Sequence, residues 1–422
     1  MNSDMPEQVT SARPGRTDVP SPPMPRRHAA LEVFLVALRL GLTSFGGPIA
    51  HLGYFRDEYV ARRKWLDEHT YAEIVALGQI LPGPASSQVG MMIGMLRAGM
   101  HGGVMAWLGF TLPSAIMLLV FAYGVASVNV ADAGWLHGLK LVAVPVVAQA
   151  VWGMATALTP DKPRITLAIV ATIVALTFST AWAQVAIIVA AAVIGCLCLG
   201  AAQAVPPVQE RSRTRQGLGI ALATLAIIGL ILVGLPIVRQ FVPSQVLAEF
   251  DSFFRVGSLV FGGGHVVLPL LEHEVVTPGW LTTEQFLAGY GAAQAVPGPL
   301  FTFSAYLGAA MHPGPLAWLY GTFTLVAIFL PAYLFVLARM PLWHLMRTHT
   351  HFQAAIRGVN AGVVGILLAA LYDPIWTTSV KTPADFSLAL ALFGMLMFWR
   401  LPPWVVVVAA AIGGAAIAAL TR

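Results

Sequence analysis

Long apolar blocks separated by short polar segments follow one another from about residue 29 to about residue 420. We count about thirteen blocks, and most contain the roughly 20 residues that a helix needs to cross a bilayer. The pattern predicts an all-α polytopic membrane protein, because a helix satisfies its backbone polar groups within one segment. Residues 1–28, which precede the first block, are rich in Pro, Ser and Arg and are expected to form a disordered tail.

The composition supports this picture and excludes other classes of protein. Of the 422 residues, 57% are apolar and 10% are charged, whereas a soluble domain carries about 25% charged residues. A soluble enzyme and a nucleic-acid-binding protein are therefore excluded. Cys196 and Cys198 lie two positions apart on one expected helix and face different directions, so we expect no disulfide, no metal site and no cofactor.

Four of the apolar blocks contain residues that break helices. The breaks are Gly46-Gly47-Pro48 in block 29–55, Pro82-Gly83-Pro84 in block 71–96, Gly262-Gly263-Gly264 in block 247–271 and Pro297-Gly298-Pro299 in block 284–311. Pro removes a backbone donor and Gly weakens a helix interior. Non-helical backbone at membrane depth is tolerated only where protein or a water-filled cavity satisfies it. The breaks therefore predict a functional region inside the protein.

The four breaks belong to an internal repeat. The matched features occur in the same order in both copies: Arg39 and Arg255, each six residues before a Phe-Gly-Gly; Trp65-Leu66 and Trp280-Leu281; Gln79 and Gln294, each three residues before a Pro-Gly-Pro; and Lys140 and Arg357. We therefore expect two homologous transport repeats, 29–202 and 247–422. A basic linker and a single extra span, 203–246, would join them.

The charges of the loops predict that the two repeats have opposite orientations. Lys and Arg in short loops mark the cytoplasmic side. Loop 127–135 has neither residue, but its counterpart 339–357 has three Arg residues. The extra span supplies the odd crossing that inversion requires, and inverted repeats are a known construction of transporters. The N-terminal tail is expected to be cytoplasmic, and whether block 29–55 is a full span or a re-entrant hairpin stays open.

Two arginines lie well inside apolar blocks. Placing an Arg at this depth costs at least about 2.5–3.5 kcal/mol, so Arg39 and Arg255 each need a partner or a cavity. Binding of an anion is one interpretation. An ion pair between Arg255 and Asp251, four residues earlier, is another, and extension of the side chain to the membrane surface is a third.

The helix breaks supply further candidate groups for an anion. A broken helix exposes unpaired N–H groups and a positive dipole end. The polar side chains near the breaks, which could add donors, are Ser44, Gln79, Ser86, Ser87, His265, Gln294, Thr302 and Ser304. The alternative is that the breaks only kink helices for packing and that the hydroxyls bond to backbone carbonyls. Lys140 and Arg357 could be interfacial anchors or vestibule charges that attract anions.

Signatures of enzymes are missing, and acids are scarce deep in the blocks, so an anion is favoured over a sodium ion as substrate. The segments FGGP and WLDEHTYAEIVALGQILPGP of the first repeat, with FGGGHVVLPLLE and WLTTEQFLAGYGAAQAVPGP of the second, resemble the chromate ion transporter family. The resemblance is to its long, two-domain bacterial members, and it is strongest at 36–113 and 250–331. One departure is Pro48, which stands where the second repeat has Gly264.

The resemblance implies a multi-pass inner-membrane exporter of chromate that confers chromate resistance, with sulfate as the structural analogue. It also implies that the arginines and the Gly and Pro residues of the breaks form the pathway. The expected partners are the anion and the lipid bilayer, without nucleic acid, and a homodimer is left open. Alternatives are an importer or exchanger of sulfate or another tetrahedral oxyanion, an anion channel, and, least favoured, a lipid-modifying enzyme.

Overall fold

The computed structural model describes residues 26–45, 47–126, 134–178, 181–199, 215–261, 266–338 and 350–421. Within these ranges the chain forms helices joined by turns and contains no strand, which confirms the all-α prediction. Some of the residues singled out in the sequence lie outside the described ranges: Gly46, Gly262, Gly263, Gly264 and His265, together with residues 1–25 of the tail.

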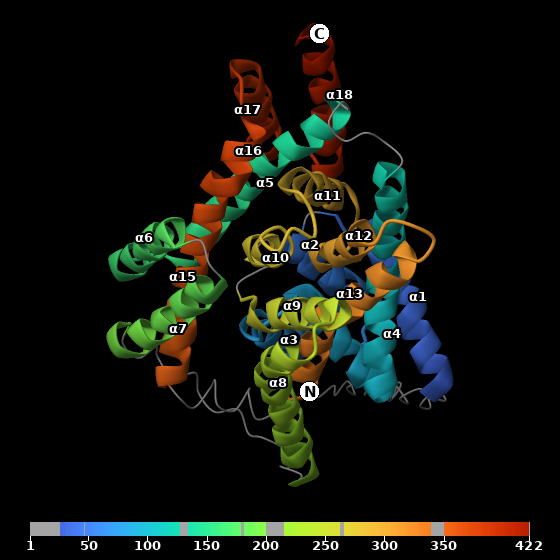
Figure 1. Ribbon diagram of the computed structural model, residues 1–422. Coiled ribbons are helices and arrows are strands. Elements are labelled where there is room, and N and C mark those ends of the chain that lie inside the picture. The colour runs from blue at the N-terminus through green and yellow to red at the C-terminus, as the bar shows by residue number, and fades with distance from the viewer. Residues whose placement is uncertain are drawn as a thin grey trace, which may run out of the picture.

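The helices follow the order of the apolar blocks (Figure 1). The first half contains α1 (Arg26–Thr43), α2 (Gly47–Phe55), η1 (Arg56–Arg62), α3 (Glu68–Ile80), α4 (Ala85–Ala126), α5 (Gly134–Leu158), α6 (Lys162–Thr177) and α7 (Ala181–Cys198). The extra span is α8 (Arg215–Phe241). The second half contains α9 (Gln245–Leu259), α10 (Val267–Val275), α11 (Thr283–Ala295), η3 (Leu300–Thr302), α12 (Phe303–Met311), α13 (Ala317–Leu337), α15 (Thr350–Ala370), η4 (Leu371–Trp376), α16 (Thr377–Ser379), α17 (Pro383–Met397) and α18 (Pro403–Thr421).

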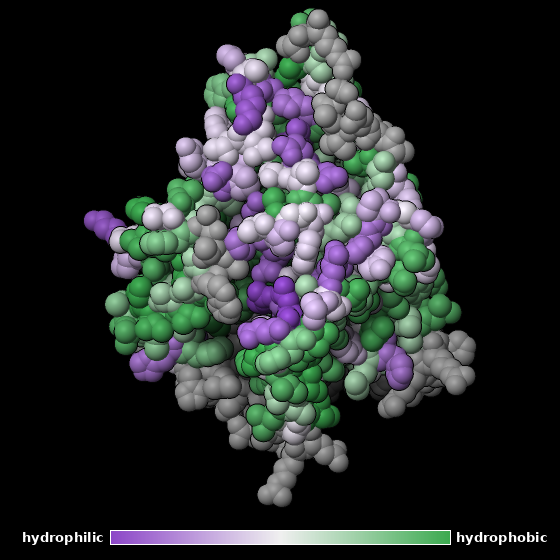
Figure 2. Space-filling view, in the orientation of Figure 1, coloured by the Kyte–Doolittle hydropathy of each residue, from purple (hydrophilic) through white to green (hydrophobic). Residues whose placement is uncertain are grey.

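Among the described residues, six helical segments are long and apolar enough to cross a membrane. They are 85–126, 134–158, 219–241, 317–337, 350–379 and 403–420. The surface agrees with this reading. Apolar side chains cover the left flank over α6 and α7 and the lower part over α8, whereas polar side chains form a band down the middle of this face (Figure 2). The chain is therefore a multi-pass membrane protein.

The longest helix, α4, is two helices joined by a sharp bend. Its 42 residues contain two non-helical positions, Ala98 and Gly99. Gly99 has a φ of +66°, and Gly94 and Gly102 lie against each other across the bend. The arm that precedes the bend, 85–97, is consequently too short to cross a bilayer by itself.

Each Pro-Gly-Pro motif forms the tip of a helical hairpin. In the first half, α3 folds back on the first arm of α4, so that Gly78 packs on Val89. In the second half, α11 folds back on α12, and the Tyr306 hydroxyl donates to the backbone carbonyl of Gln285 at 2.9 Å. Each hairpin tip is thus packed against protein, as non-helical backbone inside a membrane requires.

One helix of each half packs among the outer helices of the other half, and we call these two helices, α5 and α15, the exchanged helices. Helix α5 of the first half packs along α17 and α18 of the second, and α15 of the second half packs along α6 and α7 of the first (Figure 1). Both contacts depend on glycine. A Cβ atom on Gly138 would lie 1.9 Å from the carbonyl oxygen of Ala410, and one on Gly358 would lie 2.0 Å from that of Ala191. Small residues let membrane helices approach this closely.

Candidate functional site

The tip of each hairpin meets the helix break of the other half. The backbone N–H of Gly83 donates to the carbonyl oxygen of Val260 at 2.7 Å, and that of Gly298 donates to the carbonyl oxygen of Ser44 at 2.9 Å. Ser44 and Val260 occupy the same position in the repeat, one residue before each Phe-Gly-Gly. The structure therefore pairs each Pro-Gly-Pro tip with the residue that precedes the Phe-Gly-Gly of the other half.

Both tip glycines have backbone conformations that favour glycine. The φ angle is +112° at Gly83 and +105° at Gly298, in the region that residues with a side chain rarely adopt. A Cβ atom would lie 3.2 Å from the Cβ of Ala332 at the first tip and 2.9 Å from the Oγ of Ser114 at the second. The tips are therefore held between a helix break and a neighbouring helix with little space to spare.

A cavity of about 70 Å³ lies where the first break meets the second hairpin tip. Among its lining residues, Gly47 comes from the break, and Gln294 and Gly298 come from the tip and the helix before it. Gln149 of α5 adds a second amide side chain. A water molecule needs about 10–15 Å³ of such space, so the cavity has room for several waters or a small oxyanion.

Two features of this cavity suit an anion. Gly47 is the first residue of the nine-residue helix α2, so the unpaired N–H groups and the positive dipole end of that helix face this region. The Nε2 group of Gln294 is buried and has no hydrogen-bond partner among the described residues. The cavity thus offers donors without a compensating acidic side chain in its lining.

Several more polar groups are buried around the first break and the first hairpin tip without partners in the described part of the chain. They are the Ser44 hydroxyl, the Ser87 hydroxyl, the Gln88 carbonyl oxygen, the Thr111 hydroxyl and the Nε2 atom of His51. Leaving such a group unsatisfied costs about 1–3 kcal/mol. A cluster of them is rare in a region that serves packing alone, and it indicates a place where water or a polar ligand is accommodated.

His51 is a buried residue of this region that the sequence reasoning missed. Its Nδ1 atom shares a hydrogen bond of 3.2 Å with the Ser86 hydroxyl, and its ring packs edge-on against Phe110 with centroids 5.2 Å apart. Its position in the apolar segment PIAHLGYF, four residues after Gly47, was the signal that could have revealed it.

The hydroxyls of the second hairpin tip behave differently from those of the first. Thr302 donates to the carbonyl of Pro299 at 2.7 Å, and Ser304 donates to that of Phe301 at 2.8 Å. The sequence left open whether these hydroxyls bind an anion or bond to backbone carbonyls. In the structure both bond to backbone carbonyls. Pro82, Pro84 and Pro297 shape the tips but have no backbone N–H to offer. The unpartnered hydroxyls therefore lie near the first break and the first hairpin tip and not at the second tip.

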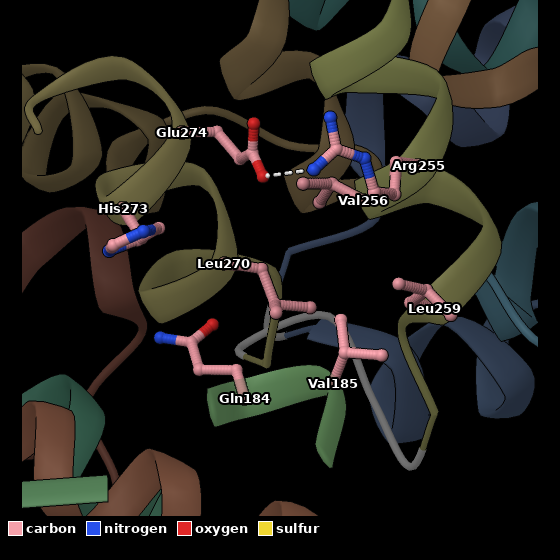
Figure 3. A pocket seen from close by; sticks show the side chains of 8 residues that line it. All are labelled: Gln184, Val185, Arg255, Val256, Leu259, Leu270, His273 and Glu274. Atoms are coloured by element: carbon pink, nitrogen blue, oxygen red, sulfur yellow. Dashed lines mark hydrogen bonds and ion pairs between the residues drawn. The ribbon is translucent and has the colours of Figure 1, made fainter. Parts of the chain in front are cut away.

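Arg255 is engaged in an ion-pair network. Its Nη1 lies 3.0 Å from Oε1 of Glu274, and its Nη2 contacts Asp251, which also pairs with Arg239 at 2.6 Å. The two guanidinium groups and two carboxylates balance in charge. Arg255 and Glu274 line a cavity of about 30 Å³, closed on the other side by α7 (Figure 3).

Arg39 has a different environment. Its side chain is exposed on α1, forms no ion pair with a described residue and does not line either cavity. Gln79, the counterpart of Gln294, is exposed as well. The structure therefore does not bring Arg39 and Arg255 into one described cavity.

The packing of the exchanged helices changes the expected match between Lys140 and Arg357. Because Gly138 and Gly358 make the equivalent close contacts, Arg357 corresponds to His137, one residue before each glycine. His137 pairs with Asp385 at 2.7 Å. Lys140 is half-buried, and its carbonyl accepts a hydrogen bond from Ser379.

An ion-pair cluster joins α1, η1 and the bend of α4 in the first half. Glu58 accepts hydrogen bonds from Arg62 at 2.9 Å and from Arg63 at 2.7 Å. Glu32 pairs with Arg63 at 3.3 Å and with Arg97 at 3.1 Å. Burial raises the pKa of Glu58, but the hydrogen bonds from Arg63 and Arg62 outweigh this effect and hold its pKa below the usual value.

Known proteins resemble this chain over almost its whole length. It is 27% identical to the chromate transport protein of Pseudomonas aeruginosa over 416 residues, which cover 96% of each chain. It is 27% identical to the chromate transport protein of Cupriavidus metallidurans, over 98% of each chain. It is also 26% identical to a probable chromate transport protein of Synechococcus elongatus, over 89% of this chain and 93% of the relative.

No solved structure matches the chain significantly. The model of the family described as chromate transporter matches residues 31–196 and 247–415. These two matched segments fall within the two repeats expected from the sequence, on either side of α8. The chain belongs to the chromate transporter family.

Proposed function

We propose that this protein exports chromate from the cytoplasm across the bacterial inner membrane. The observation that carries the proposal is the cavity between Gly47, Gln294 and Gly298, where the helix break of one half meets the hairpin tip of the other. Binding sites built from broken helices near the midplane are typical of transporters. The family membership and the names of the relatives support chromate as the substrate.

Chromate is a tetrahedral dianion, as sulfate is, and the groups around the cavity suit such an ion. The N-terminus of α2 and the unpaired amide of Gln294 are donors. Arg255 is less suited to direct contact because Asp251 and Glu274 already neutralise it. Arg39 stays a candidate, since no described carboxylate pairs with it, and we assign it an attractive role at the entrance.

Membrane potential favours the outward direction. Moving two negative charges out of a cell whose interior is negative releases about 2 × 2.3 = 4.6 kcal/mol per 100 mV. At about 1.4 kcal/mol per tenfold concentration ratio, this energy sustains a gradient of roughly three decades. Proton exchange can add to this driving force.

We further propose that the two halves are inverted and that rocking of one against the other gives alternating access. The two reciprocal hydrogen bonds, Gly83 to Val260 and Gly298 to Ser44, support a twofold relation between the halves. The opposite loop charges and the extra helix α8 support the inverted direction of that relation. In a rocking movement, the contact at one hairpin tip would open while the contact at the other tip closes.

The test is uptake of labelled chromate and labelled sulfate by proteoliposomes at both signs of membrane potential. We expect saturable chromate flux that follows the potential. Replacing Gln294→Leu should lower it at least tenfold, because a hydrogen-bond donor at the ion is lost. Gln184→Leu is the matched control, because this glutamine lines the other cavity, and its flux should stay at the wild-type level.

The same experiment separates the alternatives. A conductance that does not saturate would make the protein a channel. Sulfate flux well above chromate flux would make it a transporter of another oxyanion. A Gln294→Leu variant with full chromate flux would remove the proposed cavity from the mechanism.

A further inference from the structure

A buried carboxylate in the second half has one hydrogen-bond partner among the described residues. Glu249 of α9 is 0% exposed. Its Oε1 atom lies 2.6 Å from Nε2 of His312, and its Oε2 atom is buried without a hydrogen-bond partner in the described ranges. A buried charge is tolerated when it is paired, so the charge state of His312 decides how stable this carboxylate is.

His312 connects Glu249 to the surface. It caps the C-terminus of α12, at the turn that leads into α13, and 21% of its side chain is exposed. Its ring stacks on Tyr320 with centroids 3.7 Å apart, which fixes the direction of its Nε2 atom. One ring thus reaches both solvent and a buried carboxylate, which is the arrangement that passes a proton inward.

The first half has a charged pair in the corresponding place, but that pair cannot release a proton. Arg97 follows Pro84 by thirteen residues, as His312 follows Pro299, and both lie at the turn after the hairpin arm. Arg97 pairs with Glu32 of α1, and the helix that matches α1 is α9, which carries Glu249. Arginine stays protonated in proteins, whereas histidine changes charge near neutral pH.

The helices packed around Glu249 and His312 carry other titratable and charged groups. These are Tyr306 on α12, Tyr320 and Tyr333 on α13, Arg97, His101 and Tyr123 on α4, Arg239 on α8, Asp251 and Arg255 on α9, Glu272, His273 and Glu274 on α10, and Glu284 and Tyr290 on α11. Arg239, Asp251, Arg255 and Glu274 neutralise one another. Among the described residues, the Glu249 carboxylate is hydrogen-bonded to His312.

Helix α9 links this pair to the proposed transport site. It ends at Leu259, and the next residue, Val260, accepts the hydrogen bond from Gly83 at the hairpin tip. A change of charge at Glu249 therefore acts on the same helix that holds one of the two reciprocal contacts. When His312 loses its proton, the buried carboxylate is left without a counter-charge, which favours a position of α9 in which water reaches it.

We propose that Glu249 and His312 form a proton-binding site that couples proton entry to chromate export. This inference rests on the proposed transport of chromate. A proton from water on the side of His312 binds to the pair, and it leaves to the other side after α9 has moved. The site occupies the place that the ion pair of Arg97 and Glu32 occupies in the first half, so the two halves differ at this place in their response to pH.

The first test measures proton binding without transport. Purified protein labelled with ¹⁵N-histidine is titrated by NMR, and the His312 signal is assigned by comparison with His312→Asn. We expect the pH response of the His312 signal to differ between the wild-type protein and Glu249→Gln, because the carboxylate lies 2.6 Å from the ring Nε2 atom. A pH response that is unchanged by Glu249→Gln would overturn the proton site.

The second test measures coupling in proteoliposomes with the membrane potential clamped at zero. The wild-type protein should accumulate chromate in response to a pH gradient. His312→Arg keeps an ion pair with Glu249, as Arg97 does with Glu32, but holds its proton, so we expect at least a tenfold loss of this pH-driven flux. The matched control Glu32→Gln, in the first half, should retain it.

The outcomes separate the two proposals. If wild-type protein carries no chromate under any gradient, the proposed function is wrong. The NMR titration still tests the proton site, because it does not depend on transport. If the wild-type protein transports chromate and His312→Arg retains the full pH-driven flux, the coupling role is overturned and the transport proposal stands.

Discussion

At the scale of single residues, the two arginines that match in the sequence have acquired different surroundings. Arg255 lies in a network with Asp251 and Glu274, whereas Arg39 is exposed and has no described ion-pair partner. Replacing Arg255→Gln leaves two carboxylates with one counter-charge fewer. Replacing Arg39→Gln removes only a positive charge that we assign to attraction of the anion.

We therefore predict opposite results for the two variants. Arg255→Gln should lower the melting temperature of the purified protein, with a loss of about 1–3 kcal/mol of stability, and adding Glu274→Gln should recover part of it. Arg39→Gln should leave the melting temperature unchanged but abolish chromate resistance of cells in which the protein still reaches the membrane. Full resistance in Arg39→Gln cells would remove this residue from the mechanism.

The sequence could predict part of this pattern. It showed the paired arginines, and it offered the ion pair between Arg255 and Asp251 as an alternative, because residues four apart on a helix are neighbours. It did not reveal Glu274, which lies nineteen residues away on the other side of a break. His51 escaped notice for a similar reason: its burial depends on α4, which comes later in the chain.

At the scale of the elements, the sharpest feature is the tip of each hairpin. Gly298 combines a φ of +105° with a space too small for a Cβ atom, which would lie 2.9 Å from the Ser114 hydroxyl. Gly279 has a φ of +78°, but a Cβ atom there would meet nothing within 4 Å. The two positions therefore share a backbone conformation that favours glycine and differ in packing.

Replacing each glycine by alanine should separate these two effects. Gly279→Ala should cost about 1 kcal/mol, the penalty for a side chain in this backbone region. Gly298→Ala should cost about 1–3 kcal/mol more, because overpacking adds to the strain, and it should lower chromate flux by displacing the hydrogen bond to Ser44. Thermal melts of both purified variants measure the difference, and equal losses would contradict the tight fit at the tip.

The elements themselves were predictable to a large extent. The end of the apolar block 71–96 lies next to the bend of α4 at Ala98 and Gly99. The Pro-Gly-Pro motifs indicated the positions of the hairpin tips, because Pro and Gly interrupt a helix. The exchange of α5 and α15 between the halves was not predictable, since it depends on close contacts at Gly138 and Gly358 with helices far along the chain.

At the scale of the whole molecule, orientation in the membrane is the property on which the transport cycle depends. A repeat in the same orientation would place both hairpins on one side, and an inverted repeat places them on opposite sides. The segment 56–64 carries four Lys and Arg residues, whereas 272–283 carries neither residue type. In the inverted arrangement proposed above, helix α8 would supply the additional crossing that this difference requires.

Single cysteines at exposed positions of these segments can measure the orientation. Cys196 and Cys198 are first replaced by Ser, and Ala61→Cys in η1 or Pro278→Cys after α10 is then introduced. A membrane-impermeant maleimide added to intact cells should label the second variant and not the first, which should react only in inverted vesicles. Labelling of both positions from the same side would mean that the two halves are parallel, and the rocking mechanism proposed above would then lose its symmetry.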